Sequence, residues 1–369
     1  MSKLRVAVVG VGHLGRIHAR LLREASDAEL VAVVDPSPEA RGAVGVEFGV
    51  PSYANHQSLV GQIDAAVVAV PSRWHHAVAI DLLQHGIHVF VEKPMTLNVG
   101  DADELIAEAA ARRLTLQVGH VERFNPALVA ARPQLEDPKY IDAVRSGPFT
   151  CRSTDIGVVL DLMIHDIDVA LSLVDCEVVS VEALGAAVLG PNEDWAQARL
   201  TFAGGCVANF FASRVDWQSR RNMHVVCQSV IADIDFAARQ AKVICPSAAL
   251  NDEVNVAALS ADERTHLKDR LFDEYLPLSD LPVPENNALV EEQRDFFTAI
   301  REARPVRVSG EDGRRALDVA ERILAQIAAH RWQGAASGAI GPRHETREAV
   351  LRGPHWKAAR PAVVRRLAG

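Results

Sequence analysis

The sequence predicts an α/β protein that begins with a doubly wound parallel sheet and continues into an α+β domain with an open, mostly antiparallel sheet. Three observations predict this fold. Short apolar runs alternate with helical patterns over residues 1–120, as in sheets covered by helices on both faces. A glycine-rich turn joins the first run to the first helical pattern. After residue 120, several strand-like runs follow one another with little helix between them.

The first unit contains the apolar runs and helical patterns expected of a parallel sheet. Its expected strands are Arg5–Val9, Leu30–Val34, Ala65–Val70, His88–Val91 and Thr115–Val118. Helical patterns between them include Gly15–Ala25 and His75–His85. Because the strands are apolar almost throughout, we expect both faces of this sheet to be buried.

The second unit is predicted to span residues 121–333. One long helix is expected over Gly157–Val174, and two more are expected near the end of the unit, over Ala288–Ala303 and Gly310–Gln333. The expected strands between these helices are Val178–Leu189, Ala196–Phe202, Val207–Ser213, Met223–Val230 and Ala241–Cys245. Residues 334–369 form a basic tail. We interpret it as a solvated or subunit-embracing segment, because the whole chain is acidic; a nucleic-acid or lipid arm is the alternative.

Composition excludes several classes of function. The net charge of −9 argues against non-specific nucleic-acid binding. No apolar run has the length of a membrane span, and the N-terminal apolar stretch leads directly into the glycine turn, so it reads as a strand and not as a signal peptide. The five cysteines have no CxxC spacing and predict reduced thiols in a cytoplasmic protein, without a metal site.

The turn in VAVVGVGHLGRIHA has the spacing of a dinucleotide-binding site. Gly10 permits the tight turn, Gly12 lets backbone amides approach a pyrophosphate, and Gly15 allows close packing of helix on strand. Asp35 ends the second strand, where a carboxylate accepts hydrogen bonds from the ribose hydroxyls and repels a 2′-phosphate. The turn therefore predicts NAD in preference to NADP. The alternative is a tight strand–helix turn without a ligand.

Two further motifs carry chemistry. Lys93 follows the strand in GIHVFVEKP, and the carboxyl ends of parallel strands face the ligand crevice. In the apolar helix DIGVVLDLMIHDIDVALSLV, a polar stripe is formed by Asp161, His165, Asp168 and Ser172. Such a stripe is either an internal hydrogen-bond network or one wall of a polar site. Because a lysine at a strand end lies near a nucleotide turn, we favour the site.

These residue types suit alcohol oxidation. The reaction needs a base for the hydroxyl proton while nicotinamide takes the hydride. His165 has a suitable pKa, and the neighbouring carboxylate of Asp161 could orient it. Lys93 could stabilise alkoxide charge or share in proton transfer. The residues alone do not decide whether Lys93 or His165 is the base.

At these motifs the chain resembles the Gfo/Idh/MocA oxidoreductase family. The resemblance rests on GVGHLGRIHA, VVDPSPEA, AVPSRWHHAVA, GIHVFVEKP and DLMIHDID, and covers roughly residues 1–330. It implies a Rossmann domain followed by a domain whose open sheet makes homodimer or homotetramer contacts. It also implies that the catalytic residues are Lys93, Asp161 and His165. The implied cofactor site is lined by Gly10, Gly12, His13, Leu14, Gly15, Asp35, Pro71, His75, Glu92 and Lys93.

A finer resemblance, to a branch that includes UDP-N-acetylglucosamine 3-dehydrogenases, rests on LQVGHVERFNPA and RSGPFTCRSTDIGVV. It implies oxidation of a sugar C3 hydroxyl. The candidate substrate contacts are His120, Glu122, Arg123, Asn125 and Arg152; Glu122 and Arg123 could equally be solvated helix charges. The alternatives left open are a dehydrogenase of inositol, a free sugar or a tetrapyrrole, and a non-catalytic NAD-binding regulator.

Overall fold

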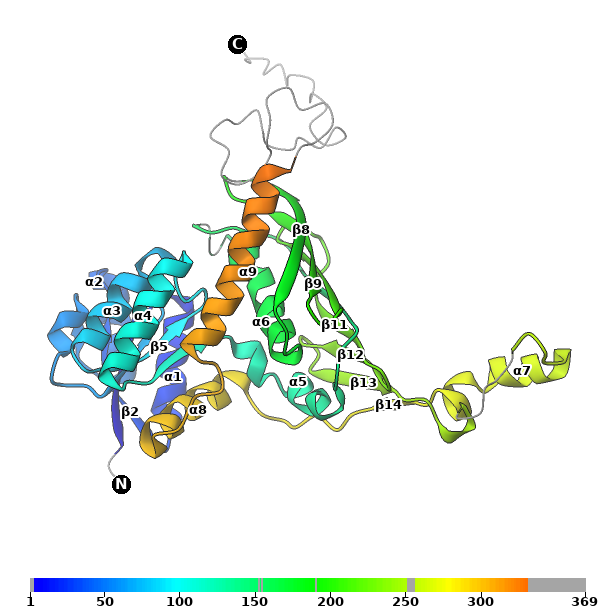
Figure 1. The fold of residues 1–369 in the computed structure, drawn as a ribbon. Coiled ribbons are helices and arrows are strands. Elements are labelled where there is room, and N and C mark those ends of the chain that lie inside the picture. Colours follow the sequence, from blue (N-terminus) through cyan, green and yellow to red (C-terminus); the bar gives the residue numbers. More distant parts are fainter. Residues whose placement is uncertain (1–2, 152, 154, 190, 251–255, 331–369) are drawn as a thin grey trace, which may run out of the picture.

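The computed structural model describes the chain apart from residues 1–2, 152, 154, 190, 251–255 and 331–369. The predicted basic tail and the candidate contact Arg152 thus lie outside the described residues. Figure 1 shows two sheets with helices between and around them, and a helical arm that stands away from the second sheet. Within the described residues, the structure has no helix long and apolar enough to span a membrane.

The first sheet is parallel and six-stranded, with the order β3-β2-β1-β4-β5-β6. Its strands are β1 Leu4–Val9, β2 Ala28–Val34, β3 Ser52–Tyr53, β4 Ala65–Val68, β5 His88–Glu92 and β6 Leu116–Gly119. Its helices are α1 His13–Glu24, α2 Pro38–Phe48, α3 His75–Gln84 and α4 Val99–Arg112. The predicted doubly wound sheet is confirmed, and the expected strand Ala65–Val70 is shorter by two residues because the chain turns after Val68.

Both faces of this sheet are buried, as its apolar strands require. Val6 and Val8 of β1 belong to a core cluster with α1 and α2, while Ala7 and Val9 belong to a larger cluster with α3 and α4. Helix α8 (Ala288–Glu302) joins the first cluster through Phe296 and Phe297, which are almost fully buried. A segment from the far end of the chain thus packs on the first sheet, and the sequence-based division at residue 120 stays a prediction.

The second sheet is eight-stranded, with the order β14-β13-β12-β11-β7-β10-β9-β8. Its strands are β7 Tyr140–Ser146, β8 Val178–Ala186, β9 Trp195–Phe202, β10 Val207–Ser213, β11 Arg220–Val226, β12 Ile231–Asp235, β13 Gln240–Ile244 and β14 Leu278–Asp280. Only β7 and β10 pair in parallel, so the predicted mostly antiparallel sheet is confirmed. The expected strand Met223–Val230 begins and ends earlier, and β7, β12 and β14 were not predicted.

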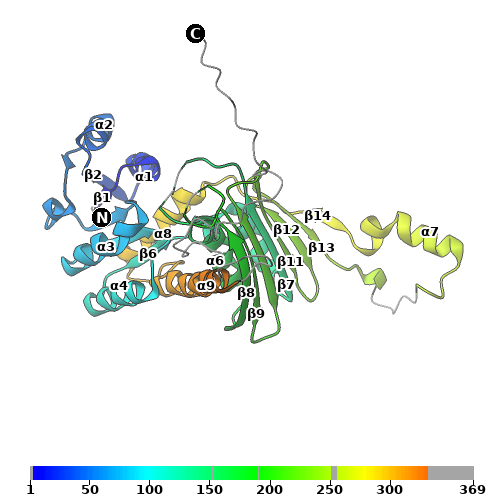
Figure 2. The same ribbon diagram turned by 90° about the horizontal axis from the view of Figure 1, so that it is seen from above.

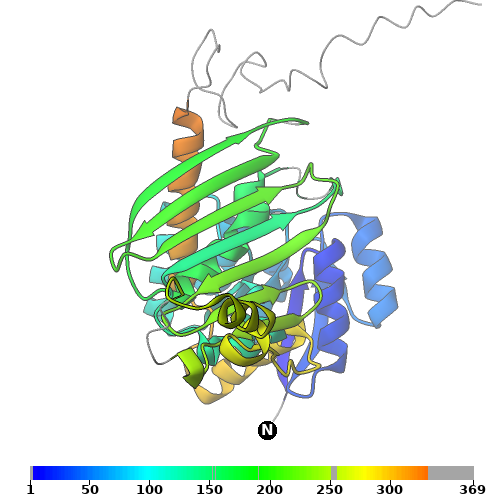
Figure 3. The ribbon, with the colours of Figure 1, turned by 90° about the vertical axis from the view of Figure 1, so that its right-hand side faces the viewer.

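One face of the second sheet is covered by helices, and the other is open. Helices α5 (Pro126–Ala131), α6 (Ile164–Leu173) and α9 (Gly310–Ala329) lie between the two sheets, as Figures 1 and 2 show. In Figure 3 the opposite face is seen without a covering helix among the described residues, apart from the arm at its edge. The sheet is therefore open on the side away from the helices.

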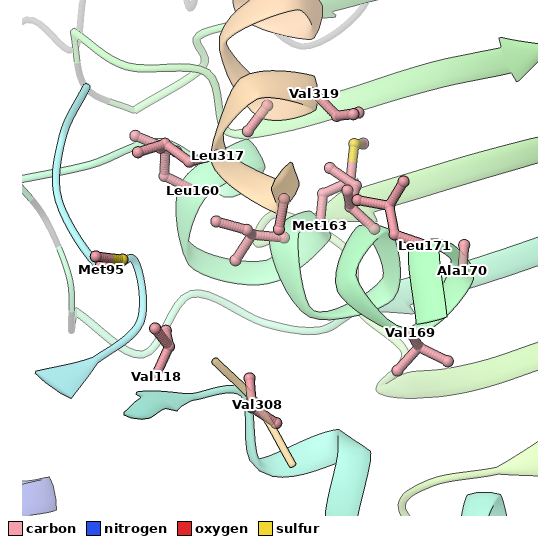
Figure 4. Close-up of a cluster of buried hydrophobic side chains, with 14 of the residues drawn as sticks. Met95, Val118, Leu160, Met163, Val169, Ala170, Leu171, Val308, Leu317 and Val319 are labelled. Atoms are coloured by element: carbon pink, nitrogen blue, oxygen red, sulfur yellow. The ribbon is translucent and has the colours of Figure 1, made fainter. Parts of the chain in front are cut away.

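The helix predicted over Gly157–Val174 is divided in the structure. A π-helical turn, Val159–Met163, precedes α6, because Ile164 N donates to Val159 O across five residues. Figure 4 shows Leu160 and Met163 of this turn packed near Leu317 of α9. A π-turn adds a residue without changing the apolar pattern of a buried helix, so periodicity could not reveal it.

Candidate active site

The dinucleotide turn has the geometry that the sequence predicts. A Cβ on Gly10, whose φ is +87°, would lie 2.6 Å from Val70 N, and one on Gly15 would lie 1.8 Å from Gly10 O. A Cβ on Gly12 would meet no atom within 4 Å, so space remains above the backbone for a pyrophosphate. The side chain of His13 at the start of α1 is exposed.

Asp35 lies beside this turn at the end of β2. Its Oδ2 accepts a hydrogen bond from Val11 N at 3.1 Å, and its Oδ1 accepts one from Ser37 N at 2.9 Å. Each carboxylate oxygen keeps a second lone pair, which can accept a ribose hydroxyl. The open space at Gly12 and the fixed Asp35 carboxylate together fit the adenosine half of NAD.

A cleft of about 380 Å³ joins this turn to Lys93 and Asp161, two of the three predicted catalytic residues, while His165 is not among its lining residues. The predicted residues among its lining are Gly10, Gly12, Leu14, Asp35, Pro71, His75, Glu92, Lys93 and Asp161. Sequence reasoning missed Ala69, Val70, Ser72, Ser153, Asp155 and Ile156, which also line it. Ser153, Asp155 and Ile156 precede the π-turn at Val159–Met163. The only sequence signal for them was their place in RSGPFTCRSTDIGVV, the segment that resembles the UDP-N-acetylglucosamine 3-dehydrogenase branch.

Lys93 and Asp161 meet in this cleft. The Lys93 ammonium donates to the Asp161 carbonyl oxygen at 2.6 Å and to Asp161 Oδ1 at 2.8 Å. Both side chains keep limited exposure, 15% and 19%. Because two of the three ammonium protons are engaged, the third is free to bind an oxygen in the cleft. The π-turn carries both acceptor atoms, which fits the frequent occurrence of such turns at functional sites.

His165 lies one turn after Asp161 but is not hydrogen-bonded to it. Its Nδ1 has no hydrogen-bond partner among the described residues. Burial, followed by the charges of Lys93 and Arg145, lowers the pKa of His165 well below its usual value. The imidazole is therefore neutral at physiological pH. The expectation that Asp161 orients His165 is corrected, because the Asp161 carboxylate binds Lys93.

A second histidine lies beside His165, and two buried carboxyl groups have raised pKa values. The His120 ring is 6.3 Å from the His165 ring, is 1% exposed, and has no partner for either nitrogen among the described residues. Burial lowers the pKa of His120 to about 3 and raises that of Asp168 to about 7. Burial, with the charge of nearby Glu92, raises the pKa of Glu292 well above its usual value.

The predicted polar stripe does not form one wall of the cleft. Asp168 lies 3.6 Å from Arg123, and Ser172 accepts a hydrogen bond from Arg132. These two side chains are engaged inside the protein, and only Asp161 of the stripe lines the cleft. The reason is the π-turn, which places Asp161 out of the 3.6-residue register of the α6 residues that follow.

Three of the candidate substrate contacts have partners within the chain. Glu122 accepts hydrogen bonds from Arg145 at 2.8 Å and from Asn125 at 2.9 Å. Asn125 also accepts one from Ala127 N at 3.1 Å and so caps α5. Arg123 lies 3.5 Å from Asp312 of α9 and is nearly buried. These contacts give Glu122, Arg123 and Asn125 partners inside the protein, and the substrate contacts expected of them stay predictions.

Glu92 and His75 hold the walls of the cleft. Glu92 Oε1 lies 2.6 Å from His18 Nε2, and the other ring nitrogen of His18 lies 2.8 Å from the Gln293 amide of α8. The two ring nitrogens of His75 lie 2.7 Å from Pro94 O and 2.8 Å from Val70 O. His18 and Gln293 were missed because an isolated polar residue on a buried helix face gives no functional signal.

The described residues include no cluster of histidine, cysteine or carboxylate side chains suited to a metal ion. All five cysteines are free. A larger cavity of about 430 Å³ lies between α4 and the start of α9, and none of the predicted site residues line it. The predicted cofactor residues, with Lys93 and Asp161, therefore lie at the smaller cleft and not at this cavity.

Comparison with known proteins agrees with this geometry. The Gfo/Idh/MocA model, described as an oxidoreductase family with an NAD-binding Rossmann fold, matches residues 4–120, and the model of that family's C-terminal domain matches residues 129–230. UDP-N-acetylglucosamine 3-dehydrogenase of Acidithiobacillus ferrooxidans is 35% identical over 330 residues, which cover 89% of this chain and 99% of that protein. Inositol 2-dehydrogenase of Rhizobium meliloti is 25% identical over 348 residues, which cover 89% and 98%.

The fold is also shared with a solved structure. The structure of UDP-N-acetylglucosamine 3-dehydrogenase from Acidithiobacillus ferrooxidans matches with a TM-score of 0.78 and 33% identity, covering 89% of this chain and 98% of that one. The family and cofactor expected from the sequence are thereby confirmed, while the roles of single residues stay predictions. The chain belongs to the Gfo/Idh/MocA oxidoreductase family, and its cofactor is NAD.

Proposed function

We propose that this protein oxidises the C3 hydroxyl of a UDP-N-acetylhexosamine, such as UDP-N-acetylglucosamine, with NAD as hydride acceptor. The observation that carries the proposal is the Lys93–Asp161 pair in the same cleft as the dinucleotide turn. The 35% identity to a UDP-N-acetylglucosamine 3-dehydrogenase over nearly its whole length supports the choice of substrate.

We propose that His165 accepts the hydroxyl proton and that Lys93 stabilises the oxyanion that forms. Bound NAD would take the hydride from the alcohol carbon. His165 is neutral and can accept the hydroxyl proton, whereas the Lys93 ammonium is held by Asp161 as a donor. Its free N–H can stabilise the alkoxide that develops as the proton leaves. Asp161 positions Lys93 through both its carbonyl and its carboxylate.

The pH profile tests this assignment. Because the pKa of His165 is lowered, the base stays deprotonated as the pH falls from 8 to 6.5, so kcat/KM for alcohol oxidation should stay level over that range. The acid limb should appear well below the pKa of about 6.5 of a free histidine. A limb at or above that value, in steady-state assays with saturating NAD, would show that a different group is the base.

A comparison of substrates tests the function itself. NAD reduction should be measured with UDP-N-acetylglucosamine, free N-acetylglucosamine and myo-inositol. We expect turnover with the nucleotide sugar and little with the other two. Turnover of inositol alone would make the protein an inositol dehydrogenase, and NAD binding without turnover of any of them would support the regulator.

We also propose that the protein is a homodimer or homotetramer. The chain between β13 and β14 carries α7 (Ala261–Asp269) and a turn over Leu271–Tyr275, which stand away from the sheet in Figures 1 and 2. Helix α7 buries none of its residues, and Phe272 beside it is 55% exposed. The arm is mostly polar, but an exposed aromatic side chain on a segment that projects from its own domain is typical of a contact with another subunit. The five free cysteines support a cytoplasmic location.

The arm gives a test of assembly. Phe272→Glu should lower the mass measured by light scattering, because a charge in an apolar interface is costly. Val46→Glu is the control, since Val46 is an exposed apolar residue of α2 at 85% exposure, far from the arm. An unchanged mass in the Phe272 variant, or an equal fall in the control, would contradict this role of the arm.

A further inference from the structure

Arg221 is on the helix-covered face of the second sheet. In the antiparallel pairing of β7 with β11, Arg221 is opposite Arg145. Residues directly opposite each other in such a pair project from the same face. Arg145 reaches Asp166 of α6, and Met223 and Val225, which alternate with Arg221 along β11, are fully buried. The Arg221 side chain therefore projects toward α6, on the side of the candidate active site.

Arg221 differs from the arginines around it in its lack of a partner. Arg145 is bound by Asp166 and Glu122, and Arg214 is bound by Asp194. Arg220, the preceding residue, is bound by Asp216. The side chain of Arg221 forms no hydrogen bond or ion pair with any residue that the structure describes, and it is exposed. The guanidinium N–H groups of Arg221 are therefore available to donate to an anionic ligand.

The position of Arg221 relates it to the reacting group. The register places Arg221 opposite Arg145, whose guanidinium binds Asp166 near the start of α6. In keeping with this, the charge of Arg221 helps to lower the pKa of His165 and counteracts the burial that raises the pKa of Asp166. A guanidinium binds phosphate oxygens in pairs, and does so better than an ammonium. A substrate whose sugar hydroxyl lies at Lys93 and His165 would therefore have Arg221 as an anion-binding group on the same face of the second sheet.

We propose that Arg221 is a specificity residue that binds the diphosphate of the nucleotide-sugar substrate. The inference rests on the proposed function and extends it, since it explains how a sugar carrying a diphosphate is preferred over a free sugar or inositol. Of the two arginines predicted from the sequence as substrate contacts, Arg123 is bound inside the protein, and Arg152 lies outside the described residues.

The test compares Arg221→Gln with Arg220→Gln at pH 8, where His165 is neutral in both. Arg220 is adjacent on β11 but projects from the opposite face and is bound by Asp216, so it is a matched control. For Arg221→Gln we expect the KM for UDP-N-acetylglucosamine and the inhibition constant of UDP to rise by about 10- to 100-fold. This is the effect expected when the charge-assisted hydrogen bonds between the guanidinium and the phosphate oxygens are lost. The kcat and the KM for NAD should stay close to wild type, and Arg221→Lys should be intermediate.

The outcomes separate the two proposals. Wild-type turnover of UDP-N-acetylglucosamine with an unchanged KM and UDP inhibition in Arg221→Gln would overturn the inference alone. An equal rise in Arg220→Gln, or a fall in kcat without a rise in KM, would also overturn it. Failure of the wild-type enzyme to turn over UDP-N-acetylglucosamine would reject the proposed function, and failure to bind UDP would reject the diphosphate site with it.

Discussion

Lys93→Met should lower kcat for sugar oxidation by about 10²- to 10⁴-fold, the range expected when a charged group that stabilises the transition state is removed. The methionine keeps much of the length of the side chain but cannot donate to the developing alkoxide. It also leaves the Asp161 carboxylate, 2.8 Å from the ammonium in the native enzyme, without its counter-charge. The measurement is kcat at saturating NAD and substrate.

NAD binding separates a catalytic effect from a structural one. The dissociation constant of NAD, measured by calorimetry, should change little, because the predicted contacts of Gly12 and Asp35 with the adenosine half of the cofactor are unaffected. Lys242→Met is a control, since Lys242 is half-exposed on β13, away from the cleft. A Lys93 variant that keeps more than a tenth of wild-type kcat would remove Lys93 from the proposed catalytic residues.

Arg145→Met should lower the free energy of unfolding by about 3–5 kcal/mol, the cost of breaking a buried ion pair from one side. Arg145 is 4% exposed and donates to Asp166 at 2.7 and 3.0 Å and to Glu122 at 2.8 Å. Its removal leaves two buried carboxylates without a cation. Urea unfolding of the two proteins measures the difference, with Arg220→Met expected to cost less than about 1 kcal/mol because its pair is on the surface.

The sign of the pH dependence provides a second check. Burial already raises the pKa of Asp166, and loss of the Arg145 charge, which opposes that rise, should raise it further. A carboxyl whose pKa is raised in the folded state binds more protons there, so its stability contribution is present at low pH and lost as the pH rises. The loss of unfolding free energy caused by Arg145→Met should therefore become smaller as the pH falls from 8 to 5. A deficit below about 1 kcal/mol at pH 8 would contradict this account of the triad.

The sequence predicted the two sheets and the cofactor turn because their signals are local. The glycine spacing, Asp35 and the alternation of strands with helices all lie within short windows of the chain. The strand β7 was missed because its inward-facing Arg145 interrupts the apolar alternation. That arginine is buried only because Glu122 and Asp166, from other elements, neutralise it. Such a pairing depends on the tertiary fold and leaves no local pattern.

The predicted catalytic residues also divide into what local sequence shows and what only the fold shows. Lys93 and Asp161 were predicted as a group, and the structure brings them into contact. The π-turn that carries Asp161 was not predicted. Because a regular helix was assumed, the sequence analysis paired Asp161 with His165, whereas Asp161 binds Lys93. Arg221 could not be singled out before the register of β7 and β11 was known, because only that pairing places it beside Arg145 on the active-site face.

The proposed reaction removes hydride from C3 of a UDP-linked sugar, and the transfer of an isotopic label from that carbon tests it most directly. UDP-N-acetylglucosamine with deuterium at C3 should be incubated with the enzyme and NAD, and the NADH analysed by mass spectrometry. We expect NADH that carries the deuterium, and slower turnover than with the unlabelled sugar. Turnover that yields unlabelled NADH would place the oxidation at another carbon, and absence of turnover would contradict the assignment of this substrate.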